Sequence, residues 1–287
     1  MGAARGTAPD RARAADEHGY HALALPDHIV DLEMIETPYP YTKDGARRWQ
    51  VGAEWPDPWV TVGHLAAATT RLRFFTSIYV AAMRSPFQVA KSVGTAAVLS
   101  GNRVALGVGI GWCREEFEVL EQEFGTRGRR TDEALDLIRR LWEPGTASFE
   151  GQFWTAPPMR MEPTPTERVP IFVGGLSEAG FARAARHDGW VGDLCTIEEG
   201  AGWAASLRDH REAIGATGDF SVIVALTDAI TPDDFRRATD LGMTDTMTAP
   251  WAYYHGLDAT LEQKLDGIAR FADDVIGPLA AGQSTSL

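Results

Sequence analysis

The sequence predicts an α/β fold in which parallel strands alternate with helices, and three observations support this prediction. The chain of 287 residues contains seven short runs with the composition of strands. Most of these runs are continuously apolar, as expected for strands that helices cover on both faces. Helical segments with recognisable start and stop signals lie between them, which favours βα units. The length also suits a single (β/α)8 barrel domain over residues 1–287.

The seven predicted strands cover residues 21–27, 71–80, 103–111, 169–175, 189–193, 220–226 and 245–251. An eight-stranded barrel needs one more strand, and its place is before the first helix. Only the letters MGAARG stand there, a stretch too short and too rich in Gly and Ala for a buried strand. We therefore expect the first strand to be missing or irregular, and we favour a chain truncated at its start relative to a full barrel. Partner contacts would then cover the open sheet edges.

The predicted helices cover residues 8–19, 58–70, 86–101, 131–142, 177–189, 231–242 and 260–276. Their boundaries follow local signals, as in the first helix, which has Pro9 near its start and Gly19 at its end. Two segments interrupt the alternation, at about 31–56 and 143–168. We interpret both as loop insertions, which in compact domains form lids or binding walls.

Composition and charge exclude several classes of protein. A net charge of −13 repels nucleic acid and anionic membranes, so neither is expected as a partner. No apolar run is long enough to span a bilayer, and the N-terminus lacks the apolar centre of a secretory signal. The two cysteines are too few for a disulfide scaffold. We expect a cytoplasmic protein that holds any anionic ligand by backbone amides or a small basic cluster.

The stretch NRVALGVGIGWCREEFE, residues 102–118, superficially resembles a nucleotide-binding loop. Its glycines at positions 107, 109 and 111 follow the pattern G-x-G-x-G, and Trp112 occupies the place of the third fingerprint glycine. The dinucleotide motif needs G-x-G-x-x-G at the start of a helix, so the pattern disfavours a Rossmann site. Glycines at a strand end also leave room for a flat ring against the backbone. We predict that Gly109, Ile110, Gly111 and Trp112 contact such a ring.

Four stretches together carry a family resemblance. They are PDHIV (26–30), RLRFFTSIYVAAMRSPFQVAKSVGTAAVLSGNRVALGVGIGWCREEFE (71–118), RTDEALDLIRRLW (130–142) and VPIFVGGLSEAGFARAARHDGW (169–190). In order and content they resemble the bacterial luciferase-like family, and within it the oxidoreductases that use the deazaflavin coenzyme F420. The resemblance is strongest over residues 9–195. It implies a TIM barrel with a flavin-type ring at the C-terminal face of the strands.

The pair Asp27–His28 is the predicted catalytic element. It follows the first recognisable strand, at the barrel end where active sites form. The resemblance implies that this pair lies beside the reactive edge of the coenzyme ring. His28 would then donate a hydrogen bond or carry a proton during hydride transfer. The alternative is a helix-entry pair, with Asp27 as a cap and His28 on the surface.

Two further coenzyme contacts are predicted. The resemblance implies a cis peptide bond between Ser77 and Ile78, which would form a bulge behind the middle ring. The run VGGLSEAG reads as a strand, a glycine pair, a Ser cap and a helix. Its backbone amides at Gly174, Gly175, Leu176 and Ser177 would bind a phosphate at a helix N-terminus. The alternative is an ordinary βα turn with an N-cap.

Trp112 marks a departure from the resemblance. In related deazaflavin-dependent sugar-phosphate dehydrogenases a Glu proposed as proton donor stands at this place, so the sequence leaves His28 as the only evident acid or base. Cys113 is expected to pack, because no base is placed to activate it. The arginines at 127, 129 and 130 are expected to pair with Asp132 or Glu133. The predicted substrate pocket consists of Trp49, Trp251 and Tyr253.

The leading hypothesis is an oxidoreductase that transfers a hydride between F420 and a small organic substrate, in a homodimer. A flavin-dependent (FMN) luciferase-like monooxygenase is the first alternative. The second is a non-catalytic paralogue that binds flavin or deazaflavin. A metal-dependent barrel hydrolase is disfavoured, because no predicted strand carries a His-x-His pair and few carboxylates stand at strand ends.

Overall fold

The computed structural model describes residues 4–283. The chain divides into two compact units. Among the described residues, unit 1 comprises 4–24, 64–74 and 175–283, and unit 2 comprises 25–63 and 75–174. Strands β1 (Ala22–Leu25) and β2 (Arg73–Thr76) begin in unit 1 and end in unit 2. The single domain expected for residues 1–287 stays a prediction.

Unit 2 is built on parallel strands that end at the candidate site. Strand β4 (Val104–Gly109) is buried at all six positions, as its apolar sequence predicts. It pairs in parallel with β3 (Tyr79–Val80) and with β7 (Ile171–Gly174), where Val108 lies opposite Val173. The core of unit 2 lies around this strand.

The helices of unit 2 begin and end at recognisable signals. They are α2 (Pro58–Ala66, which ends in unit 1), α3 (Pro86–Ser100), α4 (Arg114–Val119) and α5 (Arg127–Leu141), with a 3-10 turn η1 (Ala81–Met83). Helix α3 has Pro86 at its first position and ends at Gly101 in the left-handed conformation, with φ of 67°. The Trp142 indole after α5 donates to the Ala90 carbonyl of α3 at 3.0 Å. This bond ties α5 to α3.

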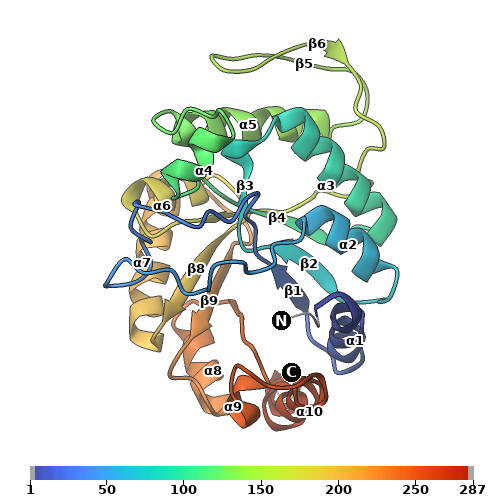
Figure 1. Cartoon of the computed structure of the whole chain (residues 1–287), viewed down its shortest axis with the longest axis vertical. Helices are drawn as coiled ribbons and strands as arrows, with labels where there is room; N and C mark the ends of the chain where they lie inside the picture. Colours follow the sequence, from blue (N-terminus) through green and yellow to red (C-terminus); the bar gives the residue numbers. More distant parts are fainter. Residues whose placement is uncertain (1–3, 284–287) are drawn as a thin grey trace. The chain divides into compact units, whose positions relative to one another are not determined.

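The predicted loop insertion at 143–168 contains an antiparallel hairpin. Its strands are β5 (Ala147–Glu150) and β6 (Thr155–Met159), and Figure 1 shows the hairpin projecting beyond α5. The Glu133 carboxylate of α5 accepts the backbone amides of residues 152, 153 and 154. These bonds anchor the hairpin turn, and they occupy the acid that was expected to pair with an arginine.

Unit 1 contains the remaining parallel strands, in the order β8 (Gly189–Cys195), β9 (Ser221–Leu226) and β10 (Asp245–Thr246). Its helices are α1 (Ala4–Glu17), α6 (Glu178–Ala184), α7 (Ile197–Ala213), α8 (Pro232–Asp240), α9 (Ala252–His255), α10 (Leu261–Phe271) and α11 (Gly277–Gln283), with a π-helical turn η2 (Ala272–Ile276). Figure 1 shows α1 beside α10. The Tyr20 hydroxyl after α1 donates to the Ile268 carbonyl of α10 at 2.9 Å.

All seven predicted strands have counterparts, with three differences of extent. The run 71–80 is interrupted at residues 77–78, so it forms β2 and β3. The run 245–251 is strand only at its first two residues, and the run at 189 extends to Cys195. Residues 4–6 of MGAARG lie in α1, and residues 1–3 lie outside the described part of the chain.

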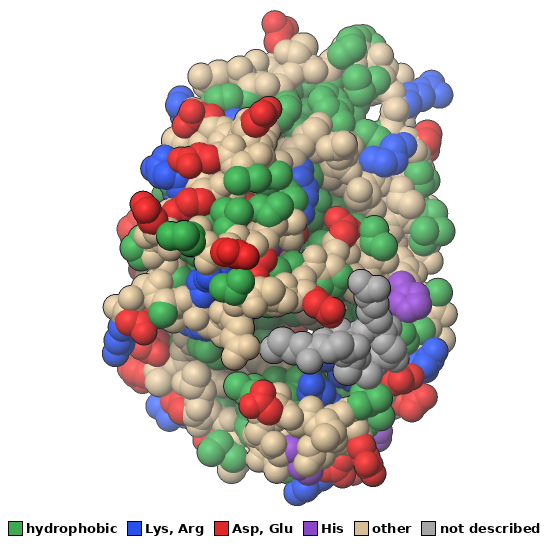
Figure 2. Space-filling view, viewed as in Figure 1, with side chains coloured by type: hydrophobic (Ala, Val, Ile, Leu, Met, Phe, Trp, Pro, Cys, Tyr) green, Lys and Arg blue, Asp and Glu red, His purple; other side chains and the backbone are tan. Residues whose placement is uncertain are grey.

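The surface agrees with the composition. Acidic, basic and hydrophobic side chains are interspersed on the face shown in Figure 2. Across residues 4–283, none of the helices combines the length and the apolar character needed to cross a membrane.

Candidate functional site

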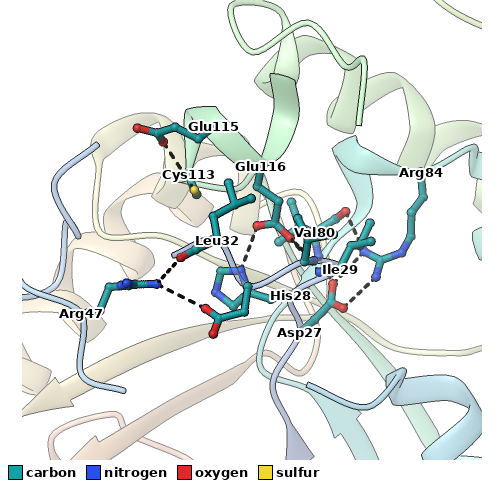
Figure 3. Close-up of polar contacts among 12 residues, drawn as sticks. Asp27, His28, Ile29, Leu32, Arg47, Val80, Arg84, Cys113, Glu115 and Glu116 are labelled. Carbon is teal, nitrogen blue, oxygen red and sulfur yellow. Dashed lines mark hydrogen bonds and ion pairs between the residues drawn. The ribbon is translucent and has the colours of Figure 1, made fainter. Parts of the chain in front are cut away.

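The candidate site lies in unit 2, where the chain leaves β1. His28 Nδ1 lies 2.9 Å from Oε2 of Glu116, which belongs to the first turn of α4 (Figure 3). The Glu116 side chain is 1% exposed and the His28 side chain 12% exposed. The other carboxylate oxygen accepts the backbone amides of Ile29 at 2.7 Å and Val30 at 3.3 Å. One buried carboxylate therefore holds both the imidazole ring and the backbone that follows it.

Asp27 holds the backbone on the other side of His28. Its carboxylate accepts the Val80 amide at 2.9 Å and both terminal nitrogens of Arg84, at 2.7 and 2.8 Å. The Arg84 guanidinium also lies over the Tyr79 ring, 4.1 Å from its centroid. This two-pronged ion pair joins the end of β1 to β3, so Asp27 fixes the site (Figure 3). Direct contact of Asp27 with a coenzyme stays a prediction.

An aromatic cluster, defined here as Tyr39, Trp49, Trp55 and Trp112, surrounds the His28 ring. The His28 centroid lies 4.7 Å from Trp55, 5.2 Å from Trp49 and 6.2 Å from Trp112. Tyr39 packs edge-on against both Trp49 and Trp112. The buried indole nitrogens of Trp49 and Trp55 have no hydrogen-bond partner among residues 4–283. The structure thus brings two predicted site residues, Trp49 and Trp112, to His28.

The segment that carries most of this cluster is fastened to α4. Glu115 accepts the backbone amides of Glu36 and Thr37, each at 2.8 Å. Burial acts to raise the pKa of Glu115, but hydrogen bonds from backbone amides and from Thr37 outweigh it and lower the pKa to about 2. Arg47 adds a bond to the Leu32 carbonyl at 3.0 Å (Figure 3). The insertion at 31–56 is therefore an ordered wall beside His28.

The predicted cis peptide bond between Ser77 and Ile78 is confirmed. The Ile78 side chain lies across the neighbouring strand ends. A Cβ atom added to Gly109 would come within 2.1 Å of Ile78 Cδ1, and one added to Gly174 within 2.6 Å. These two glycines therefore make room for Ile78, which forms an apolar surface between them.

The other glycines of the stretch 102–118 also accommodate protein atoms. A Cβ atom at Gly107 would lie 1.7 Å from the Thr76 carbonyl oxygen, and one at Gly111 would meet Phe117 within 2.6 Å. Their backbone conformation thus serves the packing of unit 2. Contact of a ring with Gly109, Ile110 and Gly111 stays a prediction.

The predicted phosphate-binding turn lies in unit 1 from Gly175 onward. Gly175 has φ of 128°, a conformation that favours glycine, and its carbonyl accepts the Trp190 indole at 2.8 Å. The Ser177 hydroxyl accepts the Gly180 amide at 3.2 Å and caps α6. Leu176 is half-buried. The expected cap is confirmed, and phosphate binding stays a prediction.

Trp251 and Tyr253, also in unit 1, pack within that unit. Trp251 adjoins Gly267 of α10 so closely that an added Cβ would lie 2.3 Å from the Trp251 Cα. The Tyr253 hydroxyl donates to the Ala229 carbonyl at 3.2 Å, and its ring packs on Phe271. Their assignment to a substrate pocket stays a prediction.

Cys113 and the arginines of α5 have packing roles. Cys113 is buried, and burial raises the pKa of its thiol to about 11. Arg127 donates to the Gly111 carbonyl at 3.0 Å, and Arg130 to Gln122 Oε1 at 2.8 Å. Among residues 4–283, no three His, Cys, Asp or Glu side chains gather in a group that could hold a metal ion.

Residues 2–268 match the luciferase-like monooxygenase family. The chain belongs to this family. An uncharacterised protein of Mycobacterium tuberculosis is 36% identical over 267 residues, which cover 92% of this chain and 93% of that protein. The F420-dependent glucose-6-phosphate dehydrogenase of Segniliparus rotundus is 30% identical over 194 residues, 66% of this chain and 52% of that enzyme.

The fold of a solved structure agrees. The monooxygenase RslO1 of Streptomyces bottropensis has a TM-score of 0.72 at 20% identity, covering 94% of this chain and 92% of that one. This likeness confirms the predicted α/β barrel fold of the luciferase-like type. The family match and the relative from Segniliparus rotundus identify this protein as an enzyme of the oxidoreductase class.

Sequence reasoning missed Glu116 as a partner of His28. The statement that His28 is the only evident acid or base is corrected by the buried carboxylate at 2.9 Å. The sequence held one signal, the two adjacent acids in REEFE at the start of a charged helix. One of them, Glu116, is buried together with Phe117. A carboxylate is rarely buried without a partner, so its burial indicates that a partner is present.

Proposed function

We propose that this enzyme transfers a hydride between coenzyme F420 and a small, uncharged organic substrate, with His28 as the proton carrier. The observation that carries the proposal is the buried His28–Glu116 pair inside an aromatic cluster. Clefts with mostly apolar linings and a few placed polar groups are typical of small-molecule sites. Histidine is the side chain best suited to proton transfer near neutral pH.

The residues of unit 2 fit a flat tricyclic coenzyme. The Ile78 side chain lies between Gly109 and Gly174 and offers an apolar backing. Asp27 bonds to the Val80 amide, which brings the end of β1, and with it His28, to the segment that follows Ile78. When bound, the deazaflavin supplies the hydride chemistry. We propose that Ile78, Gly109 and Gly174 hold its ring.

The chain itself supplies orientation, exclusion of water and a proton path. The Trp49 and Trp55 rings lie against His28 and restrict access of water to it. Of the charged groups near His28, Asp27 and Arg84 neutralise each other, and the Glu116 carboxylate adds a negative charge. An uncharged substrate with an apolar body therefore suits this wall better than a phosphorylated one, and a hydroxyl or carbonyl group on it would reach His28.

An FMN-dependent monooxygenase is the second candidate function, because the family is described as luciferase-like monooxygenases and RslO1 is a monooxygenase. Both candidate enzymes have the same fold, so the chemistry of the bound coenzyme ring distinguishes them. A protein that binds the coenzyme without catalysing its reduction would be a third outcome. The F420 proposal is supported by the 30% identity to the F420-dependent glucose-6-phosphate dehydrogenase of Segniliparus rotundus.

A donor screen with matched histidine variants tests the proposal. The protein is mixed with oxidised F420 and a panel of apolar alcohols, and loss of the visible absorption of the coenzyme is followed. We expect turnover with at least one alcohol, loss of about 10²- to 10⁴-fold in His28→Asn, and retained activity in His64→Asn, whose side chain is exposed on α2. Equal activity of both variants would contradict the role of His28.

We also propose a cytoplasmic homodimer. Val60 of α2 and Leu99 of α3 are more than two-thirds exposed, with 75% and 71% of their surface accessible, and Val98 is 39% exposed. We propose that these side chains contribute to a subunit contact, a role for which exposed apolar surface is suited. Light scattering of the purified protein would give the dimer mass if the proposal holds and the monomer mass if it does not.

A further inference from the structure

We infer that Glu116 is a positioning residue that fixes the tautomer of His28, so that the proton sits on Nδ1 and the lone pair on Nε2. The inference has two parts. The tautomer follows from the contacts of the chain alone. Its catalytic consequence rests on the proposed function.

The contacts of Glu116 determine which ring nitrogen carries the proton. Glu116 Oε1 accepts two backbone amides, from Ile29 and Val30, and Oε2 faces His28 Nδ1 at 2.9 Å. An ionised carboxylate has only acceptor sites, so the atom opposite Oε2 has to be a donor. Nδ1 is therefore the N–H nitrogen. In a neutral imidazole the other nitrogen, Nε2, is then the proton acceptor.

The surroundings leave the ring little freedom to choose another arrangement. The backbone before His28 is held by Asp27 through Val80 and Arg84, and the backbone after it is held by Glu116 itself. The Trp55 ring packs at 4.7 Å from the imidazole centroid, close enough to oppose rotation of the ring. Second partners of this kind fix both tautomer and orientation of histidines.

The fixed tautomer gives His28 a definite role in the proposed reaction. In oxidation of an alcohol, the hydroxyl proton would pass to His28 Nε2, and a bound deazaflavin would take up the C–H hydride with its electron pair. The carbon–oxygen bond becomes a carbonyl, and His28 becomes an imidazolium. The Glu116 carboxylate stabilises this cation through the Nδ1–H bond. In the reverse direction, the imidazolium returns the proton to the oxygen as the hydride arrives at carbon.

A purely structural role for Glu116, as a tether for residues 29–30, makes a different prediction. In Glu116→Gln the side-chain carbonyl can still accept the Ile29 amide, so the tether is retained. The new NH₂ group is a donor and faces Nδ1, which must then provide a lone pair. The proton would move to Nε2. If Glu116 served only to hold residues 29–30, Glu116→Gln would leave the tautomer of His28 unchanged.

Proton–nitrogen correlation NMR of the protein without coenzyme tests the tautomer directly. His28 signals are assigned as those absent in His28→Asn, and Glu118→Gln serves as the matched control on the exposed side of the same helix. We expect Nδ1–H in the wild type and in Glu118→Gln, and Nε2–H in Glu116→Gln. A wild-type Nε2–H tautomer overturns the inference, and so does an unchanged tautomer in folded Glu116→Gln. If that variant does not fold, the wild-type spectrum still decides.

Steady-state kinetics test the catalytic consequence. With F420 and an alcohol donor, we expect Glu116→Gln to lower kcat by about 10²- to 10⁴-fold, because removal of a group that sets a catalytic tautomer has effects of this size. KM should change much less, since substrate contacts are unaltered. A change in kcat below twofold in folded Glu116→Gln overturns the consequence. If the wild type shows no turnover with any donor while the tautomer is as expected, the proposed function fails and the positioning role stands.

Discussion

The Asp27–Arg84 ion pair is expected to be one of the strongest single contributions to the stability of unit 2. The Asp27 side chain is 1% exposed and the Arg84 side chain 14% exposed, with two N–H to oxygen contacts at 2.7 and 2.8 Å. The third bond, to Val80, leaves the carboxylate with three donors. Removing one member of a buried pair costs about 3–5 kcal/mol, because the other charge stays buried without compensation.

We therefore expect Asp27→Ala to lower the free energy of unfolding by about 3–5 kcal/mol. Asp27→Asn keeps the shape but loses the charge assistance of two bonds, so a loss of about 2–4 kcal/mol is expected. The matched control is Asp10→Ala, which removes the exposed pair with Arg13 and should change stability by less than about 1 kcal/mol.

Urea unfolding followed by far-UV circular dichroism measures these differences, with the slope of the transition compared among variants. A double-mutant cycle with Arg84→Ala isolates the coupling between the two side chains. If Asp27→Ala lowers the free energy of unfolding by less than about 1 kcal/mol at an unchanged slope, the reasoning is refuted, because a loss of that size is typical of an exposed ion pair.

Three further predictions concern neighbouring residues. Hydrogen bonds outweigh burial and hold the pKa of Glu115 at about 2, below its ordinary 4.5, so its contribution to stability is complete above pH 4.5 and is lost as pH falls through 2. Acid unfolding of Glu115→Gln should therefore show a flatter pH dependence than that of the wild type. Equal pH profiles of the two proteins would contradict the role of Glu115 in holding residues 36–37. Gly109→Ala should lower the free energy of unfolding by about 1–3 kcal/mol, because the added Cβ would overlap Ile78. Gly63→Ala, in open space on α2, should raise it by about 0.5–1 kcal/mol. Thermal or urea unfolding measures both, and equal effects of the two substitutions would contradict the contact between Gly109 and Ile78. Burial raises the pKa of Cys113 to about 11, so thiol reagents should label it at neutral pH only after the protein unfolds. Rapid labelling of the folded protein would contradict this expectation.

Local signals predicted most of the scaffold. Strand β4 is apolar along its whole length and buried along its whole length. Helix α3 begins at Pro86 and ends at Gly101, as its sequence indicates. Helix α7 was missed, although Thr196 and Glu199 form a capping box at its start. Its apolar residues form no clear stripe, so the periodicity that predicts other helices is weak there.

The hairpin at 147–159 was missed for a different reason. Its second strand has the sequence TAPPM, and prolines argue against a central strand. In a two-stranded hairpin both strands are edges, so a proline need not donate to a ladder. The Glu133 carboxylate that fixes the turn comes from a helix, and a contact of that kind leaves no local signal.

The candidate site was predicted in part. His28 and the cis bond at Ile78 follow from family-like motifs near strand ends. The partner of His28 lies 88 positions away, at Glu116, and only the tertiary fold brings the two together. Glycine at position 109 signals a close approach, but the sequence does not say whose atoms approach. The structure shows that they belong to Ile78.

The central claim is that the luciferase-like site acts with a deazaflavin. Parallel titrations of the purified protein with F420 and with FMN, followed by the visible absorption of each coenzyme, test it most directly. We predict saturable binding of F420 and reduction of the bound coenzyme by an alcohol donor, with little or no binding of FMN. Tight binding of FMN with no binding of F420 would contradict the account.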